Sequence, residues 1–287
     1  MALTTSYSFQ FNGLTFGSGT PFQVYDVDGL EGLPDLRTQD DNRGFNDGEF
    51  SGRDFYSGRH LTFTILVLAG NGNTAQQNLN LLQAALIPQQ SGTTTLYYLL
   101  DVNATTQRLE ARVRSRKVLI DPEYTFGYIR AQYTFFAPDP RYYDDTLKTI
   151  TFSPTPTANG RTYSRTFNYT YGGVSNINQG TVVNAGTVAT DGTITIAGPA
   201  TLPVISVSNS AGAFALTVNY ALQTGDVLTI DTSLKTLTLN GSTARNLLLN
   251  SSSWFNFPPG SSTLSFSASN VTTGTTSVSV TYRNAYV

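Results

Sequence analysis

The sequence lacks several side chains on which catalysis and metal binding commonly depend. It has no cysteine, and His60 is the single histidine among 287 residues. Without cysteine there is no disulfide framework, no thiol nucleophile and no thiolate metal site. A multi-histidine metal centre is also excluded, and a Ser-His-Asp triad would have to use that one imidazole. The sequence therefore predicts no metal site and no cofactor.

Charge and long apolar runs are also scarce. Charged residues make up 13% of the chain and the formal net charge is −2, whereas an ordinary soluble protein has about 25% charged residues. This balance argues against a protein that binds nucleic acid through phosphate contacts, and we expect no sequence-specific nucleic-acid binding. The longest apolar run, residues 65–69, is far shorter than the roughly 20 residues of a membrane helix. The N-terminus lacks the basic region of a signal peptide, so we expect a soluble chain without either segment.

The charged residues are unevenly distributed along the chain. Residues 1–150 contain 12 Lys/Arg and 16 Asp/Glu, whereas residues 151–287 contain 5 and 3. The change coincides with residues 153–160, a stretch of Pro, Ser, Thr, Asn and Gly that is typical of a linker. The sequence therefore predicts two domains, residues 1–150 and residues 151–287, each long enough to bury its own core.

The first domain has a mainly β pattern with one helix. Asn12-Gly13 separates two short apolar runs, and this dipeptide favours a tight hairpin turn. A helix is predicted over residues 73–87, where Pro88 would end it. Its apolar stripe has helical spacing and consists of Ala75, Leu79, Leu82 and Leu86.

The second domain shows no helical period. Short β-rich runs recur there at intervals of about 8–14 residues with turn residues between them, as in an antiparallel sandwich. Asn240-Gly241 marks one expected hairpin. The sequence therefore predicts an all-β second domain.

Several short motifs, in the same order along the chain, resemble those of one protein family. In the first domain they are GLEGLP at residues 29–34, YSGRHLT at 56–62 and FAPDPRYY at 136–143. In the second they are VNAG at 183–186, IAGP at 196–199, GD at 225–226, ID at 230–231 and SWFNFPPG at 253–260. Together they resemble the distal tail proteins of long-tailed, non-contractile phages, the siphophage tail component family.

This resemblance implies a fold and a function. The fold is mainly β, with an N-terminal split β-barrel-like domain that carries one helix and a C-terminal galectin-like antiparallel β-sandwich. The implied function is structural: a hexameric ring at the tail tip that joins the tail tube to the adsorption and penetration apparatus. The implied partners are further copies of the chain, the tail tube protein and a tail fibre or hub protein. The implied location is the virion, after synthesis in the host cytoplasm.

A ring subunit needs two different contact surfaces, because a heterologous interface closes only at the right rotation. The Gly-rich, charged segment 37–59 is a candidate arm that lies across a neighbouring subunit; the alternative is an ordinary mobile surface loop. Its candidate interface residues are Arg37, Asp40, Asp41, Arg43, Asp47, Glu49, Arg53 and Arg59.

Three arginines form a second charged feature. Arg112, Arg114 and Arg116 alternate along one predicted strand and are therefore expected to lie on one face. That face could pair with the acidic arm of a neighbour or line a lumen for DNA. The alternative is a solvated sheet face, with the intervening Ala111, Val113 and Ser115 turned inward.

The sequence offers little support for catalysis. His60 is expected to begin a strand and to be satisfied by a local hydrogen bond. The acidic pairs Asp40/Asp41 and Asp144/Asp145 are adjacent in sequence, so in an extended chain their side chains point to opposite faces. We therefore expect no enzyme and no catalytic residues.

Carbohydrate binding by the second domain is the alternative function, with host cell-wall glycan as the ligand. Exposed aromatic rings can stack on sugar faces, and Trp254, Tyr169, Tyr171 and Tyr220 are the candidates. Core packing is the competing role for Trp254, because a large ring beside a strand often fills a sandwich interior.

Overall fold

The computed structural model describes residues 3–120, 122–154, 178–272 and 274–287. The chain forms two compact units: residues 1–146 with 286–287, and residues 147–285. The division falls slightly before the predicted one, because Lys148 to Ile150 already pair with a strand of the second unit. The mainly β fold with a single α-helix is confirmed for the described residues.

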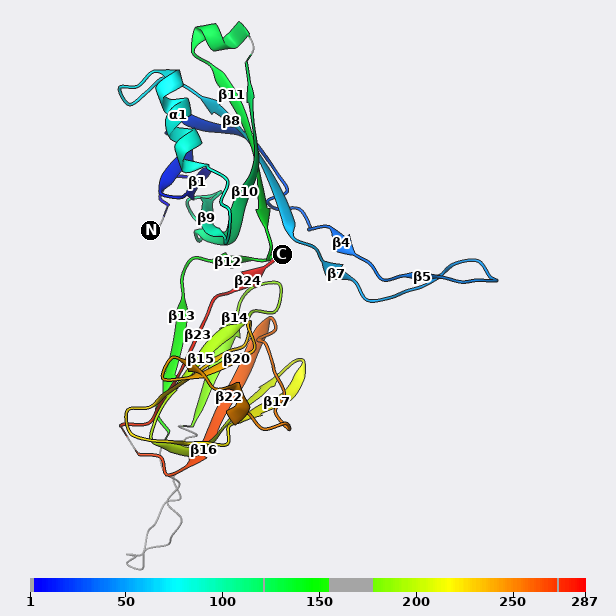
Figure 1. The fold of residues 1–287 in the computed structure, drawn as a ribbon, viewed down its shortest axis with the longest axis vertical. Coiled ribbons are helices and arrows are strands. Elements are labelled where there is room, and N and C mark those ends of the chain that lie inside the picture. The colour runs from blue at the N-terminus through cyan, green and yellow to red at the C-terminus, as the bar shows by residue number, and fades with distance from the viewer. Residues whose placement is uncertain (1–2, 121, 155–177, 273) are drawn as a thin grey trace, which may run out of the picture. The chain divides into compact units, whose positions relative to one another are not determined.

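The first unit is built around a strongly bent antiparallel sheet (Figure 1). Its main path runs β2-β1-β9-β10-β11-β8-β3. The 13-residue strand β10 pairs with β9 through its first half and with β11 through its second, so one strand belongs to both parts of the split barrel. The bounds are β1 (Ser8–Phe11), β2 (Leu14–Gly17), β3 (Phe22–Asp28), β8 (Arg59–Val67), β9 (Thr94–Leu99), β10 (Gln107–Leu119), β11 (Ile129–Ala137) and β12 (Tyr142–Asp144).

Local sequence explains the hairpin and helix of this unit. Asn12 and Gly13 both have positive φ, 47° and 81°, and connect β1 to β2 in the predicted tight turn. The helix α1 (Ala75–Ala85) begins with a capping box. The Thr74 side chain accepts from the Gln77 backbone N–H, while the Gln77 side chain accepts from the backbone N–H of Thr74.

The interior of the first unit is rich in aromatic rings. Phe9 stacks on Phe16, and both meet the edge of Phe63, which in turn contacts Phe135. These four side chains are fully buried. Because edge-to-face contacts add to the burial of large apolar surfaces, this cluster holds the two parts of the bent sheet together.

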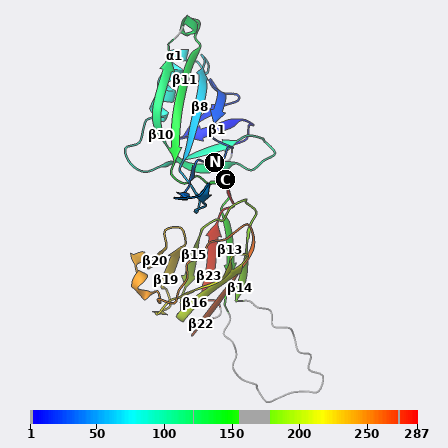
Figure 2. The same cartoon turned by 90° about the vertical axis from the view of Figure 1, so that its right-hand side faces the viewer.

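The second unit is an antiparallel sandwich of two sheets, with a separate apolar core (Figure 2). One sheet has the order β13-β23-β15-β19-β20-β21, and the other has the order β14-β22-β16-β17, with β18 beside β16. The bounds are β13 (Lys148–Phe152), β14 (Gln179–Asn184), β15 (Gly192–Ala197), β16 (Ala200–Asn209), β17 (Gly212–Thr217), β18 (Ala221–Leu222), β19 (Val227–Asp231), β20 (Thr236–Leu239), β21 (Ser242–Thr243), the 3₁₀ helix η2 (Arg245–Leu247), β22 (Gly260–Ser269) and β23 (Ser277–Tyr282). The last strand, β24 (Ala285–Tyr286), belongs to neither of these two sheets and pairs with β12.

Candidate assembly surfaces

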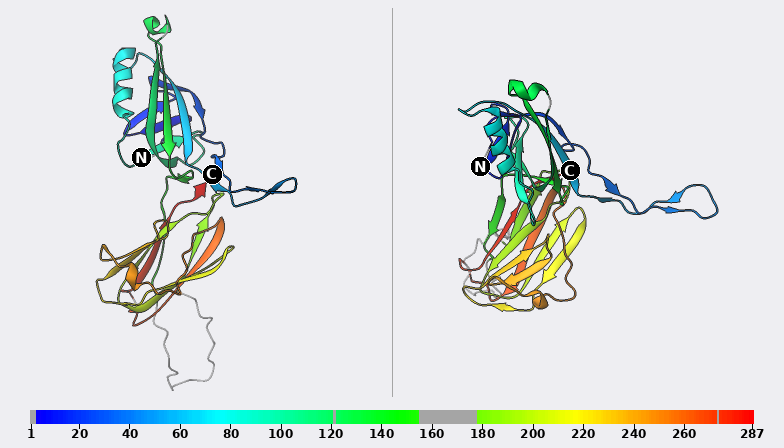
Figure 3. Two further views of the ribbon diagram at one scale, coloured as in Figure 1. Left: turned by 45° about the vertical axis from the view of Figure 1, so that its right-hand side comes forward. Right: turned by 45° about the horizontal axis from the view of Figure 1, so that its top comes forward.

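A long two-stranded excursion leaves the first unit between β3 and β8. It is held together by two short pairings, β4 (Leu36–Arg37) with β7 (Phe55–Tyr56) and β5 (Asp41–Asn42) with β6 (Glu49–Phe50). Both views of Figure 3 show it projecting away from the sheet of its unit. Every residue from 35 to 56 is exposed. We call residues 35–56 the arm.

The arm has no apolar core of its own and carries apolar side chains on its surface. Phe45 is fully exposed and Phe50 is 60% exposed. The guanidinium of Arg43 lies 5.0 Å from the centre of the Phe50 ring, and those of Arg37 and Arg53 each lie 5.7 Å from that of Phe55. Apolar surface gathered on an extended segment is typical of a protein contact. The predicted segment is therefore an exposed excursion held by two short strand pairings, and its contact with a neighbouring subunit stays a prediction.

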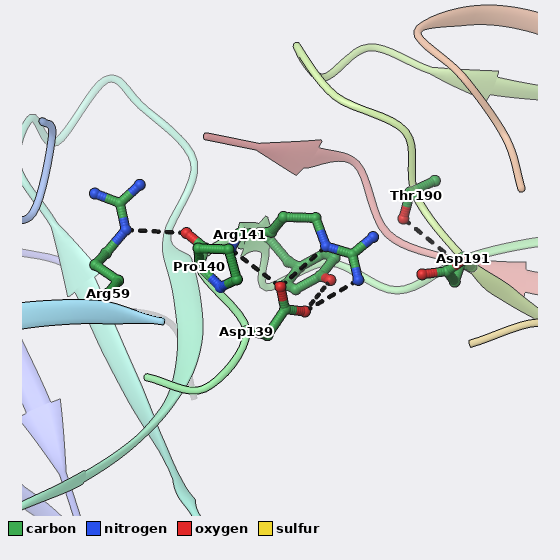
Figure 4. A network of polar contacts seen from close by, with 7 residues as sticks. Arg59, Asp139, Pro140, Arg141, Thr190 and Asp191 are labelled. Carbon is green, nitrogen blue, oxygen red and sulfur yellow. Dashed lines mark hydrogen bonds and ion pairs between the residues drawn. The ribbon is translucent and has the colours of Figure 1, made fainter. Parts of the chain in front are cut away.

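Arg59 lies at the base of the arm and is buried within its own unit. It is 2% exposed. Its Nη1 donates to the carbonyl oxygens of Gly29, Leu30 and Gly32, and its Nε donates to that of Pro140 at 2.9 Å (Figure 4). Burial lowers the pKa of this guanidinium below its usual value.

The role expected for Arg59 at a subunit interface is therefore corrected. Its guanidinium is occupied by carbonyls of its own chain, and it closes the loop that leads into the arm. A glycine is required at position 29, where the loop passes close to the backbone of His60. Gly29 has φ of +81°, and a Cβ there would lie 2.1 Å from the His60 carbonyl oxygen.

The three arginines of β10 do not share one face. A β-bulge between Val113 and Ser115 shifts the register, so that Arg112 lies opposite Phe136 but Arg116 lies opposite Tyr133. Tyr133 is fully buried, whereas Phe136 is half-buried on the other side of the sheet. Because directly opposed residues share a face, Arg116 lies on the inner side of the strand pair.

The bulge also separates the residues expected to point inward. Ala111 and Val113 are buried, but Ser115 is exposed, opposite Thr134. The guanidiniums of Arg112 and Arg114 lie 5.8 and 5.0 Å from the Phe136 ring centre, which places both on the outer face. Strict alternation failed here because one extra residue inverts every later position.

His60 lies on the same outer face, beside an aromatic ring. Its ring is exposed and lies 5.0 Å from that of Phe136, the residue opposite it on β11.

Asp144 is buried, and the hydroxyl of Tyr286 contacts it at 3.5 Å. In the described part of the chain, no group of three or more His, Asp or Glu side chains could hold a metal ion. No helix among the described residues is long and apolar enough to span a membrane.

Two of the four aromatic candidates for carbohydrate binding, Trp254 and Tyr220, lie among the described residues. Trp254 and Tyr220 are each half-buried and pack against the core of the second unit. Tyr169 and Tyr171 lie outside the described residues. A small groove does lie elsewhere on this unit, with a volume of about 280 Å³, and sequence reasoning missed it because serine and alanine give no distinctive signal. Its lining residues are Ser206, Val207, Ser208, Ala213, Phe214, Ala215 and Ser265.

A second exposed apolar feature was also missed. The tip between β10 and β11 contains the 3₁₀ helix η1 (Pro122–Phe126), and Ile120 and Phe126 there are 82% and 78% exposed. An ion pair between Arg130 and Glu123, 2.9 Å apart, braces the tip. These residues lie close together in the sequence, at 120–130, but only the fold shows that this segment is the exposed end of a strand pair.

Comparison with known proteins gives a family match for the C-terminal region and a fold match for the whole chain. Residues 185–286 match a family model described as "Siphovirus-type tail component, C-terminal domain". No curated protein sequence matches the chain.

Three solved structures resemble the whole chain. The Dit protein of phage SPP1, described as a paradigm of the hub adsorption apparatus in phages that infect Gram-positive bacteria, has 15% identity and a TM-score of 0.67, over 99% of this chain and 100% of that one. The activated phage P2 baseplate with calcium has 12% identity and a TM-score of 0.52, and the one with strontium has 12% and 0.50; each covers 96% of this chain and 97% of the other.

At these identities the structural likeness shows the fold alone, and the family model covers residues 185–286 rather than the whole chain. The resemblance drawn from the sequence motifs is confirmed by both comparisons. Residues 185–286 are thus similar to the C-terminal domain of siphovirus-type tail components, and the fold of the chain is similar to that of the SPP1 Dit protein over almost its whole length.

Proposed function

We propose that this chain is a structural protein of a phage tail tip, a distal tail hub that forms a hexameric ring and joins the tail tube to the host-adsorption apparatus. The observation that carries the proposal is the exposed arm on a chain that matches the SPP1 hub protein from end to end. A heterologous ring requires a projecting element and a receiving surface on every copy. The arm supplies the projecting element.

The proposed partners follow from this position. One face of the ring would contact the tail tube protein and the other a tail fibre or hub protein, and the protein would be found in the virion. The role is that of a scaffold rather than an enzyme, since the family model that matches residues 185–286 describes a tail component.

The test is the mass and shape of the purified full-length chain, alone and co-expressed with its tail tube protein. Light scattering should give about six times 31.0 kDa, and negative-stain images should show closed rings. A chain that stays monomeric in both preparations would contradict the proposal.

A second candidate function is glycan binding by the second unit. The observation that favours it is the groove on the β16–β17–β22 surface, where the hydroxyls of Ser206, Ser208 and Ser265 line an uncharged hollow. Neutral hydroxyls suit a neutral saccharide better than a charged polymer. Binding of purified host cell wall should fall when Ser206→Val and Ser265→Val are combined, but not in Trp254→Phe. Equal binding by all of these proteins would contradict this function.

A further inference from the structure

The outer face of the β10–β11 pair carries positive charges that form no ion pair with any described residue. Arg112 lies opposite Phe136, and Lys117 lies opposite Gln132, on the side away from buried Tyr133. The bulged Arg114 joins this face through its contact with Phe136. None of these three cations takes part in an ion pair within the described part of the chain. We call Arg112, Arg114, Lys117 and Phe136 the basic face.

The arm carries the opposite charge. Residues 35–56 contain six acidic and three basic residues, and the outer half contains Asp40, Asp41, Asp47 and Glu49 beside a single Arg43. The Asp40 carboxylate accepts the Gly52 backbone N–H at 2.8 Å, which ties the two arm strands together. Across the described ranges, none of the four carboxylates is ion-paired. At the end of the arm, fully exposed Phe45 adds an apolar group.

The two surfaces are complementary but do not satisfy each other within one copy. All arm residues are exposed, and no ion pair among the described residues joins the arm to β10. Each strand of the arm has about ten residues and therefore reaches roughly 33 Å at the rise of an extended chain. That length is enough to reach beyond a small β domain to a second copy.

We propose that the acidic outer half of the arm, residues 40–50, docks on the basic face of a second copy of this chain. Asp41, Asp47 and Glu49 would face Arg114 and Lys117, and Phe45 would pack beside Phe136. This contact rests on the proposed ring and specifies its receiving surface. An acidic arm placed on an acidic surface would be repelled, so charge also determines which surface of the second copy the arm binds.

Double-stranded DNA is the other polyanion that the basic face could meet. Among the described residues, only three unpaired cations lie on that face, which is a small number for DNA. A duplex presents a long, dense row of phosphates and would need many cations along its path. The arm of a second copy fits this charge pattern better.

The experiment uses two full-length charge-reversal variants. The arm variant combines Asp41→Lys, Asp47→Lys and Glu49→Lys, all exposed and away from the hydrogen bond of Asp40. The face variant combines Arg114→Glu and Lys117→Glu, both exposed. The matched control is Arg245→Glu, an exposed cation of the second unit. Thermal melts establish that each variant is folded.

Each variant alone should lose rings, with association weakened by more than about tenfold at low salt, while Arg245→Glu forms rings like the wild type. Mixing the two variants should restore rings that contain both in equal numbers. In an alternating ring, every reversed arm meets a reversed face and every native arm meets a native face.

The outcomes separate the two proposals. If the wild type forms no ring alone or with its tail tube protein, the proposed function fails and this contact fails with it. If the wild type forms rings and the variants do so equally well, or if mixing restores nothing, only the docking contact is overturned. Rings that persist in the face variant but bind less double-stranded DNA would overturn it in favour of a DNA-facing surface.

Discussion

Each unit fixes a loop through one buried polar side chain, but this side chain is charged in the first unit and neutral in the second. In the first, the Arg59 guanidinium is buried and donates to four backbone carbonyls. In the second, the buried amide of Asn184 donates to the carbonyls of Val188 and Phe257 and accepts from the Gly186 backbone N–H. A neutral amide is thus sufficient to hold a loop in the second unit.

This difference bears on the purpose of the charge. The second unit folds around its own core with 9 charged residues among positions 147–285. The first unit has 27, of which 9 lie in the exposed arm and 3 are the cations of the basic face. Exposed charges contribute little to stability individually. We therefore expect the charges of the arm and the basic face to serve contacts with other molecules.

Shortening the arm should have the largest effect. Replacing residues 38–53 with a short Gly-Ser turn should abolish rings, because the projecting contact is gone. The melting temperature of the chain should change little, since these residues are exposed and contribute nothing to the core. Light scattering and calorimetry on the same sample measure both quantities. Rings that survive the replacement would show that charge in the arm does not serve assembly.

Phe257→Ala should produce the largest loss of stability in the second unit. Phe257 is fully buried and contacts Phe255 and Tyr282, so its removal should cost about 3–5 kcal/mol. Trp254→Ala should cost less, because Trp254 is only half-buried. Denaturant unfolding gives both values, and peptide-resolved hydrogen exchange shows which unit is affected. A larger loss for Trp254 than for Phe257 would contradict this assignment.

Arg59→Met and Asn184→Ala compare the stability that the buried guanidinium of the first unit provides with that from the buried amide of the second. Four carbonyls lose a charged donor, so we expect a loss of about 3 kcal/mol, against about 1–3 kcal/mol for Asn184→Ala. Hydrogen exchange should localise the first loss to the base of the arm. Arg53→Met is the matched control and should change stability by less than about 0.5 kcal/mol, because Arg53 is exposed. If Arg53→Met and Arg59→Met lower stability equally, the buried hydrogen bonds of Arg59 do not stabilise the first unit more than an exposed arginine does.

As pH rises above 10, the first unit should lose stability before the second. The expected loss is smaller than the losses from the substitutions above. Burial raises the pKa of Tyr133 to about 12 and also raises the pKa of Tyr98. A raised phenol pKa favours the neutral folded form, so its stabilising contribution is complete below pH 10 and is lost as pH rises toward the folded value. Tyr133 alone should lower stability by about 1 kcal/mol at pH 11.

Hydrogen exchange between pH 9 and 11, corrected for the intrinsic rate, measures this loss in each unit. The control is Tyr133→Phe combined with Tyr98→Phe, which removes both buried phenols. It should reduce the difference in pH dependence between the units. If the difference persists unchanged in the double variant, other groups are responsible for it.

Much of the architecture was predictable because its signals are local. Asn12-Gly13 forms the expected turn, since this dipeptide tolerates positive φ at both positions. The apolar stripe and the capping residues place the helix within the predicted range, although the structured helix is shorter at both ends. Alternating short runs indicate a sandwich because half of each strand must face a core.

The candidate assembly surfaces were only partly predictable. The charged, Gly-rich composition singled out the arm, because such a segment cannot bury itself. The role of Arg59 was missed, since three of its carbonyl partners lie near Gly29 and the fourth is at Pro140, about eighty residues along the chain. Arg112, Arg114 and Arg116 were expected on one face, but the bulge between Val113 and Ser115 places Arg116 on the inner side of the strand pair and Lys117 on the outer side.

The sequence by itself therefore determined the chemistry of this protein: β-rich, without thiols, and charged mainly in its first half. Composition and short-range periodicity act through neighbouring residues, so they are legible along the chain. The tertiary structure decided which charges are buried, which face each arginine occupies and how far the arm stands away from its unit. Those features depend on strand register and on contacts between distant segments, which a linear pattern does not contain.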